Sequence, residues 1–246
     1  MVEVLQSMGF EIEASHHEVG PGQNEINFHF ASVLEACDKL QIFKQVVKET
    51  ARKHGLYASF MPKPLDNTWG NNLSITLDVL KDDSSIFQNE IGEKFIAGVL
   101  NRSREITLFF NSIPNSFERL GRSNAPESSC LEKEPPNCFA TFSTWEENKK
   151  LVFNSMDNSC NIYILMSLIL RAGLEGINND YKLEDFKEVS LPHSFNEAIS
   201  LAENSEFVKE VMGEKFLSMF LAVKKDLAKE YKEDKMTEER RTFERI

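Results

Sequence analysis

The sequence from residue 8 to residue 55 reads MGFEIEASHHEVGPGQNEINFHFASVLEACDKLQIFKQVVKETARKHG. Between Glu25 and Phe30, apolar and polar residues alternate, which is the period of a half-buried strand with one polar face. Ser32 and Glu35 then form a capping box, and apolar residues recur at helical spacing from residue 33 to residue 51. We therefore predict a strand that carries Glu25 on its polar face, followed directly by a long amphipathic helix.

Similar patterns extend over the rest of the chain. Alternation or bulky side chains predict strands at residues 57–61, 73–79, 139–144 and 151–155. Helical spacing predicts helices at residues 91–110, 162–174 and 194–227, the last of which begins with a second capping box and contains a glycine. Because no internal repeat or linker interrupts these elements, we expect one domain of the α+β class over residues 1–246.

Two segments have compositions that differ from the rest of the chain. Residues 121–136 are rich in Ser, Pro, Asn and Glu, and such a segment buries too little apolar surface to offset its ordering entropy. We expect an exposed, mobile loop there. Residues 232–246 are mostly charged and are expected to form a C-terminal tail.

The composition excludes several classes of protein. Lys and Arg total 28 against 39 Asp and Glu, which gives a net charge of −11 and argues against a nucleic-acid partner. The longest apolar run, residues 162–170, is too short to span a membrane, and the N-terminus lacks the pattern of a signal peptide. We expect a soluble, cytoplasmic protein. Its cysteines lack the spacing of a zinc site, so we assign them no chemistry: they are Cys37, Cys130, Cys138 and Cys160.

Several motifs, in this order along the chain, resemble those of the class I glutamine synthetase family. They are residues 8–26, 43–48, 51–56, 60–65, 95–100, 115–120, 157–161 and 191–194. The resemblance implies a catalytic-domain-like fold in which a curved antiparallel sheet, part of a barrel, is backed by helices. It extends to about residue 231, and we expect the chain to lack the family's N-terminal β-grasp domain. We therefore expect the chain to be the C-terminal portion of that catalytic domain.

The resemblance implies roles for residues that match the family motifs. Glu18 and Glu25 match two acidic ligands of the family's divalent metals, and Arg119 matches the arginine that binds the substrate glutamate. Each also has a simpler interpretation, because two carboxylates without partners are often structural and Arg119 could form an ion pair with Glu118 or another acid. No third His or Cys at metal-site spacing accompanies His16 and His17, so we expect them to be structural or solvent-exposed.

Other family positions are occupied by residues that cannot do the same chemistry. Ser74 stands at a metal-binding histidine, Asp78 at a serine, and Asn124 at the flap glutamate that helps to deprotonate ammonium. Val152 stands at a metal-ligand glutamate and Asn154 at an arginine. Between residues 122 and 171 the sequence has no arginine, although the resemblance implies several that clamp phosphates. Removing one such group costs about a hundredfold or more in rate, so we expect no ligase activity.

These losses point to a pseudoenzyme without a cofactor. They resemble a non-catalytic branch of the family in the vertebrate lens, which implies a scaffolding role with intermediate-filament proteins as partners. The resemblance also implies self-association into homo-oligomers when the N-terminal domain is present, although the charged end of this chain argues against ring stacking through it. One alternative is a residual ATP-dependent glutamate–amine ligase that uses Mg²⁺ or Mn²⁺. Another is a fragment that folds only marginally.

Overall fold

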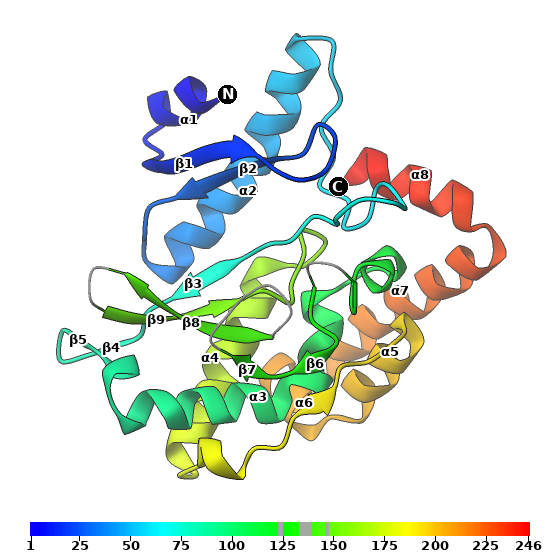
Figure 1. Ribbon diagram of the computed structural model, residues 1–246. Helices are drawn as coiled ribbons and strands as arrows, with labels where there is room; N and C mark the ends of the chain where they lie inside the picture. The colour runs from blue at the N-terminus through cyan, green and yellow to red at the C-terminus, as the bar shows by residue number, and fades with distance from the viewer. Residues whose placement is uncertain (123–124, 133–138, 146–147) are drawn as a thin grey trace.

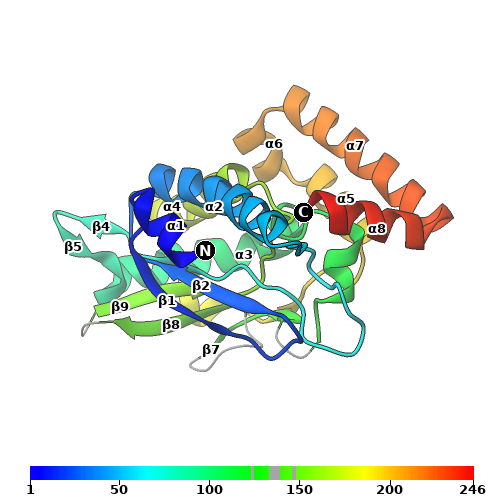
Figure 2. The same ribbon diagram turned by 90° about the horizontal axis from the view of Figure 1, so that it is seen from above.

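The computed structural model describes residues 1–122, 125–132, 139–145 and 148–246. Figure 1 shows the chain, and Figure 2 shows it from above. The helices are α1 (Val2–Ser7), α2 (Val33–Lys53), α3 (Glu90–Phe110), α4 (Ile162–Asn178), α5 (Phe195–Asn204), α6 (Glu206–Met212), α7 (Glu214–Glu233) and α8 (Lys235–Arg245). The strands are β1 (Ile12–His17), β2 (Asn24–Phe28), β3 (Ile75–Leu77), β4 (Leu80–Lys81), β5 (Ser84–Ser85), β6 (Ser128–Ser129), β7 (Leu131–Glu132), β8 (Ala140–Trp145), β9 (Asn148–Phe153) and β10 (Val189–Ser190). Short 3₁₀ turns lie at Ile86–Gln88, Pro114–Glu118 and Leu183–Asp185.

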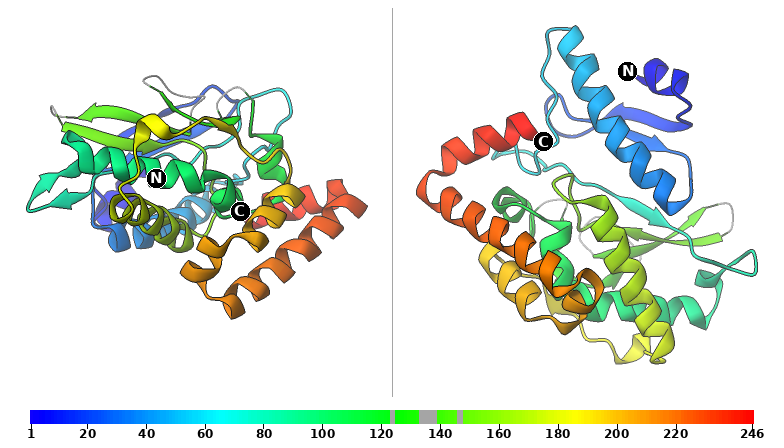
Figure 3. Two further views of the ribbon diagram at one scale, coloured as in Figure 1. Left: turned by 90° about the horizontal axis from the view of Figure 1, so that it is seen from below. Right: turned by 180° about the vertical axis from the view of Figure 1, so that it is seen from behind.

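Helices α3 and α4 form the centre of the core, where they pack along each other (Figure 3). Their backbones approach closely because glycines lie at the contact. A Cβ atom added to Gly98 would lie 2.1 Å from the carbonyl oxygen of Ala172, and one added to Gly176 would lie 2.1 Å from that of Lys94. Both helices begin as sequence rules predict: Asn89 caps α3 and Asn161 caps α4.

The main sheet has the strand order β3-β9-β8-β7 and packs on this helical core. Phe139 and Phe153 contact each other on its buried side, and Phe139 stacks on Phe110 of α3. Strands β3, β9 and β8 are antiparallel, but β7 runs parallel to β8. Two-stranded pairs form separately from β1 and β2, from β4 and β5, and from β6 and β10. The expected single curved antiparallel sheet is thus replaced, over the described residues, by one mixed sheet and three small antiparallel ones.

Most predicted helices and strands are present, with four corrections. The segment 194–227, predicted as one helix, forms three: α5, α6 and α7. Residues 57–61 form no strand, because the backbone N–H of Phe60 donates to the C-terminal residue Ile246 and not to a neighbouring strand. Strand β3 is shorter than the predicted segment 73–79. Helix α2 lacks the side-chain cap that the Ser32 capping box predicts, whereas Ser194 does accept a hydrogen bond from the backbone N–H of Glu197.

The two polar segments also differ from expectation. Within residues 121–136, the described part includes strands β6 and β7 with buried Ser129 and Cys130, so it is not wholly an exposed loop. The remainder, residues 123–124 and 133–136, lies outside the described residues. Most of the charged segment 232–246 is helix α8, which folds back onto the chain after α2, where Phe243 stacks on Tyr57 (Figures 1 and 2). In the described residues, no helix is both long enough and apolar enough to cross a membrane.

Candidate functional site

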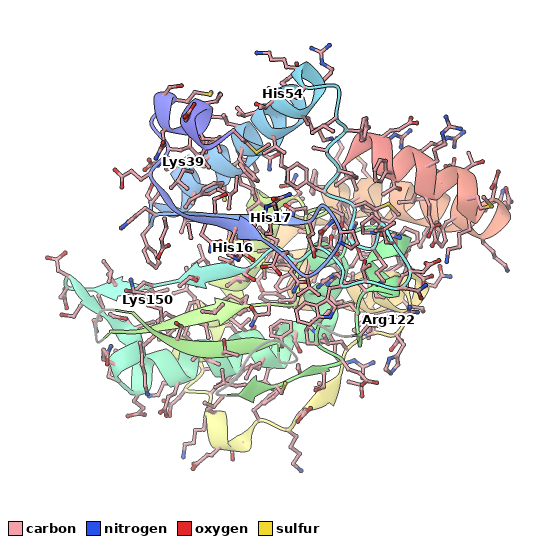
Figure 4. The ribbon with its side chains drawn as sticks, turned by 45° about the horizontal axis from the view of Figure 1, so that its top comes forward. His16, His17, Lys39, His54, Arg122 and Lys150 are labelled. Atoms are coloured by element: carbon pink, nitrogen blue, oxygen red, sulfur yellow. The ribbon has the colours of Figure 1, made fainter. Side chains whose placement is uncertain are left out.

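The β1–β2 hairpin brings together two glutamates and a histidine. His16 on β1 pairs with Glu25 on β2, and Glu18 follows two residues after His16, so all three side chains share one face. The Nε2 atom of His16 lies 3.1 Å from a carboxylate oxygen of Glu18 and 3.9 Å from one of Glu25. Figure 4 labels His16 and His17 near the turn of this hairpin.

This donor set fits one partly hydrated divalent cation. One ligand atom from each of His16, Glu18 and Glu25 lies within 4.8 Å of the others. Carboxylate oxygens are the ligands that hard cations prefer, and water completes the shell of such ions in open sites. Sequence spacing alone did not place His16 here. The signal was its position two residues before Glu18 on a strand whose partner carries Glu25.

A second group of predicted positions meets on strands β3 and β9. Thr76 pairs with Val152, so the next residues outward, Ser74 and Asn154, lie side by side. The Ser74 hydroxyl donates to Oδ1 of Asn154 over 3.4 Å, and the buried Nδ2 of Asn154 has no hydrogen-bond partner among the described residues. A hydroxyl, an amide and a valine carry no formal charge, so these positions supply neither a cation nor a carboxylate ligand.

Strand β9 carries two lysines, Lys149 and Lys150. Lys150 lies two residues before Val152 on β9 and therefore on the same face, a position that the sequence analysis missed (Figure 4). Its Nζ atom lies 3.7 Å from the centre of the Phe30 ring, a cation–π contact. The alternation of faces along a strand, counted back from Val152, could have identified Lys150. Lys150 thus connects the sheet to the segment that follows β2.

Of the two other positions that the resemblance implies are replaced, only Asp78 lies within the described residues. The carboxylate of Asp78 accepts a hydrogen bond from the Ser85 hydroxyl over 2.5 Å, which ties the end of β3 to β5. Asn124, at the position of the flap glutamate, lies outside the described residues. The structure therefore brings Ser74, Val152 and Asn154 together but gives Asp78 a local role in the β4–β5 hairpin.

Arg119 is enclosed by groups of its own chain. Only 1% of the residue is exposed. Its Nη2 atom donates to Oδ1 of Asn111 over 2.9 Å and to the backbone oxygen of Ser155 over 2.6 Å, and its Nη1 atom donates to Asn72. A carboxylate oxygen of buried Asp157 lies 3.8 Å away. Glu118, the first partner considered for Arg119, pairs with Arg122 and Lys235 instead.

Two lysines lie near the same buried aspartate. Lys224 of α7 donates to the backbone oxygen of Ser112, and Lys44 of α2 donates to that of Asn158, each over 2.7 Å. Burial lowers the pKa of Lys224 to about 8, and the negative charge of Asp157 opposes this shift. Burial lowers the pKa of Lys44 as well, against the charges of Cys160 and Asp157. Asp157 is therefore the anionic centre of a buried polar cluster that joins four segments of the fold.

Comparisons with known proteins agree with this arrangement of strands and helices. A family model described as "Glutamine synthetase, catalytic domain" matches residues 1–243. A glutamine synthetase of Methanosarcina mazei is 35% identical over 93% of this chain and 57% of its own length. One of Staphylococcus aureus (strain MW2) is 34% identical over 88% of this chain and 54% of its own length. The chain belongs to the glutamine synthetase catalytic-domain family, and it spans little more than half the length of these relatives.

Solved structures show the same fold at lower sequence identity. A ligand-free GmaS structure has a TM-score of 0.85 and 23% identity, and the match covers 100% of this chain and 62% of that one. A cryo-EM structure of Plasmodium falciparum glutamine synthetase has a TM-score of 0.86 and 19% identity, with 94% and 58% coverage. At these identities the likeness concerns the fold alone.

Proposed function

We propose that this chain is a catalytically inactive member of the glutamine synthetase family with a scaffolding role. The observation that carries the proposal is the environment of Arg119, the one substrate-binding arginine that the family resemblance assigns to it. Its guanidinium is buried and bonded to Asn111, Ser155 and Asn72, close to Asp157. Both terminal nitrogens, Nη1 and Nη2, donate inside the fold, whereas Nε has no partner among the described residues. An arginine that is 1% exposed and whose terminal nitrogens are held in this way offers no open fork to a substrate carboxylate.

The neighbouring strand face supports the same proposal. Binding a triphosphate needs cations and metal ligands that converge on it. Ser74, Val152 and Asn154 provide neither, and Lys150 lies against the ring of Phe30. Catalytic groups that act together have non-additive effects, so the loss of charge at several of these positions is expected to abolish the reaction and not merely to slow one step.

Ligand binding tests this proposal more directly than turnover, because the chain spans only part of its relatives. Calorimetric titration of L-glutamate, and of ATP with Mg²⁺ or Mn²⁺, is expected to give no saturable heat. Saturable glutamate binding by the wild type that Arg122→Met retains and Arg119→Lys loses, with both variants folded by circular dichroism, would overturn it. The same titrations on a longer form of the protein, together with an assay for glutamine formation, extend the test.

The scaffolding part of the proposal follows from the resemblance to lengsin, the lens member of this family. From this resemblance we propose cytoplasmic intermediate-filament proteins, and further copies of the chain itself, as the binding partners. Co-sedimentation with assembled intermediate filaments is the direct assay. We expect the chain to pellet with the filaments and to stay in solution without them. Recovery of metabolic enzymes alone from a lens-extract pull-down, with no filament protein, would contradict this role.

One observation favours the alternative, a residual ATP-dependent glutamate–amine ligase. His16, Glu18 and Glu25 present three ligand atoms within 4.8 Å of one another, as a site for Mg²⁺ or Mn²⁺ requires. Ser74 and Val152, at the positions of further metal ligands, offer no matching donors. Saturable Mn²⁺ binding that Glu18→Gln abolishes, together with ATP binding that depends on this metal, would favour the ligase over the scaffold.

A further inference from the structure

Helix α7 carries an apolar stripe on its outer side. Its inner side contributes the buried residues Leu217 and Leu221 to the core. Phe216, Met219 and Val223 are spaced as neighbours on one helix face and are 51%, 62% and 65% exposed. The helix lies at the edge of the molecule in Figures 2 and 3. Such a run of large apolar side chains is typical of a surface that another molecule covers.

An open hollow of about 460 Å³ adjoins the N-terminal end of the stripe. Phe216 and Met219 form part of its lining, and the rest comes from the junction between α6 and α7: Met212, Gly213, Glu214 and Lys215. Gly213 has a φ of +76° and no side chain, so the chain turns here and leaves the space open. The stripe and the hollow thus form one continuous apolar surface that has both a ridge and a recess.

Unlike charges lie at the two ends of the stripe. Lys215 and Asp226 are eleven residues apart, close to three helical turns, so they lie on nearly the same line along the helix beside the apolar residues. Both are exposed, and neither belongs to an ion pair within the described part of the chain. The two ends of α7 are therefore complementary in charge to each other.

We propose that α7 is an interface at which two copies of this chain form an antiparallel, two-fold dimer. A two-fold axis beside Met219 places Phe216 opposite Val223 of the second copy, since each residue adds about 1.5 Å along the helix. It also places Lys215 of each copy within one turn of Asp226 of the other. Val223 of the second copy then lies at the level of the hollow that Phe216 and Met219 line. Such self-complementarity is what a two-fold interface requires.

The charge pattern selects a second copy over an unrelated partner. A surface with one cation and one anion at opposite ends matches its own image after a two-fold rotation, without any other sequence. The contact of one helix pair falls short of the ~1,200–2,000 Å² that stable complexes bury in total. We therefore expect a weak dimer that dissociates on dilution.

Analytical ultracentrifugation of the 246-residue chain over a range of concentrations tests the interface. We expect a monomer–dimer equilibrium that Met219→Glu weakens by roughly 10- to 100-fold, because it buries a charge without a partner at the centre of the contact. Leu34→Glu is the matched control. Leu34 is 66% exposed on α2, so the same substitution there leaves the equilibrium unchanged. Monomer at every concentration, or a dimer that tolerates Met219→Glu, would refute the proposal.

Charge exchange tests the antiparallel arrangement itself. Lys215→Asp and Asp226→Lys each place like charges together and are expected to weaken the dimer several-fold. The double variant restores the pairing with inverted sign and recovers most of the wild-type affinity. Circular dichroism confirms that the variants are folded. If the double variant associates no better than the single ones, the two helices are not paired in this direction.

A cysteine at the two-fold axis gives an independent result. Met219→Cys would lie beside its own copy, so mild oxidation is expected to produce a disulfide-linked dimer beyond the level of the wild type. Glu233→Cys, exposed near the far end of α7, serves as control and is expected to cross-link no more than the wild type. Equal cross-linking of the two variants would overturn the proposed axis.

Discussion

The α3–α4 pair and the strand face of Ser74, Val152 and Asn154 belong to the same domain but depend on different physics. The helices meet through Gly98 and Gly176, where no side chain fits, so shape decides the contact. The strand face carries a hydroxyl, an amide and a valine where the family resemblance implies charged groups. Packing can therefore be retained at one place in the domain while another place lacks the charged groups that the resemblance implies. The comparison shows that family membership and fold say little about activity.

Replacing the glycines at the helix contact tests the packing side of this comparison and should have the largest effect. A Cβ at Gly176 would lie 2.1 Å from the carbonyl oxygen of Lys94, and backbone cannot move aside as a flexible side chain can. We expect Gly176→Ala to cost about 4 kcal/mol or to prevent folding. Urea denaturation followed by circular dichroism measures it.

Gly55→Ala is the matched control for that substitution. Gly55 has a positive φ, +70°, which Gly176 does not have, and no atom lies within 4 Å of an added Cβ, so backbone strain is the only cost of the substitution. It should cost about 1 kcal/mol. Equal losses at the two sites would mean that α3 and α4 do not depend on this close approach.

Substitution of Arg119 tests whether a residue that the resemblance assigns to a substrate site belongs instead to the framework of the fold. Arg119→Met leaves Asp157 buried without its guanidinium partner, and breaking such a buried pair costs about 3–5 kcal/mol. Arg122→Met removes an exposed arginine 3.4 Å from Glu118 and should cost no more than about 0.5 kcal/mol. Thermal denaturation of the two variants provides the comparison. A loss of stability below about 1 kcal/mol for Arg119→Met would contradict a structural role and would indicate that Arg119 belongs to an open binding site.

Lys224 predicts a pH dependence of stability with a definite sign. Burial lowers its pKa from 10.5 to about 8, so between these values the unfolded chain holds a proton that the folded chain has lost. The free energy of unfolding of the wild type should therefore rise with pH in this window. Relative to Lys224→Met, the gain should reach up to about 3 kcal/mol, and it should be absent below pH 8.

Urea denaturation of the wild type and of Lys224→Met at pH 7, 8, 9 and 10 measures that difference, which cancels the titration of all other groups. Lys225→Met is the control. Lys225 is exposed and pairs with Glu203 at the surface, so its substitution should not change the slope with pH. A constant difference between wild type and Lys224→Met would show that Lys224 keeps its ordinary pKa.

Local patterns predicted the elements that are defined by their own sequence. Apolar periodicity identified α2, α3 and α4, and alternation identified β2, β8 and β9. Residues 57–61 have the side chains of a strand but bond to the C-terminal helix, which is a contact between distant parts of the chain. The charged end of the chain was expected to be a tail, but it forms α8, which is held by the stack of Phe243 on Tyr57.

The same limit applies to the candidate site. Motif spacing located Glu18, Glu25 and Arg119, but whether a side chain points into a site or into the core depends on its neighbours in space. The burial of Arg119 follows from Asn72, Asn111 and Asp157, which lie on three different segments. His16 was considered and set aside, because the strand β1 that places it beside Glu18 and opposite Glu25 was not predicted. Lys150 was missed, although alternation along β9 places it on the face of Val152.

The hairpin site should show the smallest effect and separates the two proposed functions most sharply. Glu25→Gln removes one of two neighbouring, partly exposed carboxylates, so we expect a change in stability within about 0.5 kcal/mol. A pseudoenzyme without a resident metal should also unfold at the same temperature with and without millimolar Mn²⁺. A cation bound to the folded state would stabilise it in proportion to the logarithm of its concentration. If Mn²⁺ raises the unfolding temperature of the wild type but not that of Glu25→Gln, the hairpin binds a metal ion even though the other expected metal ligands are replaced.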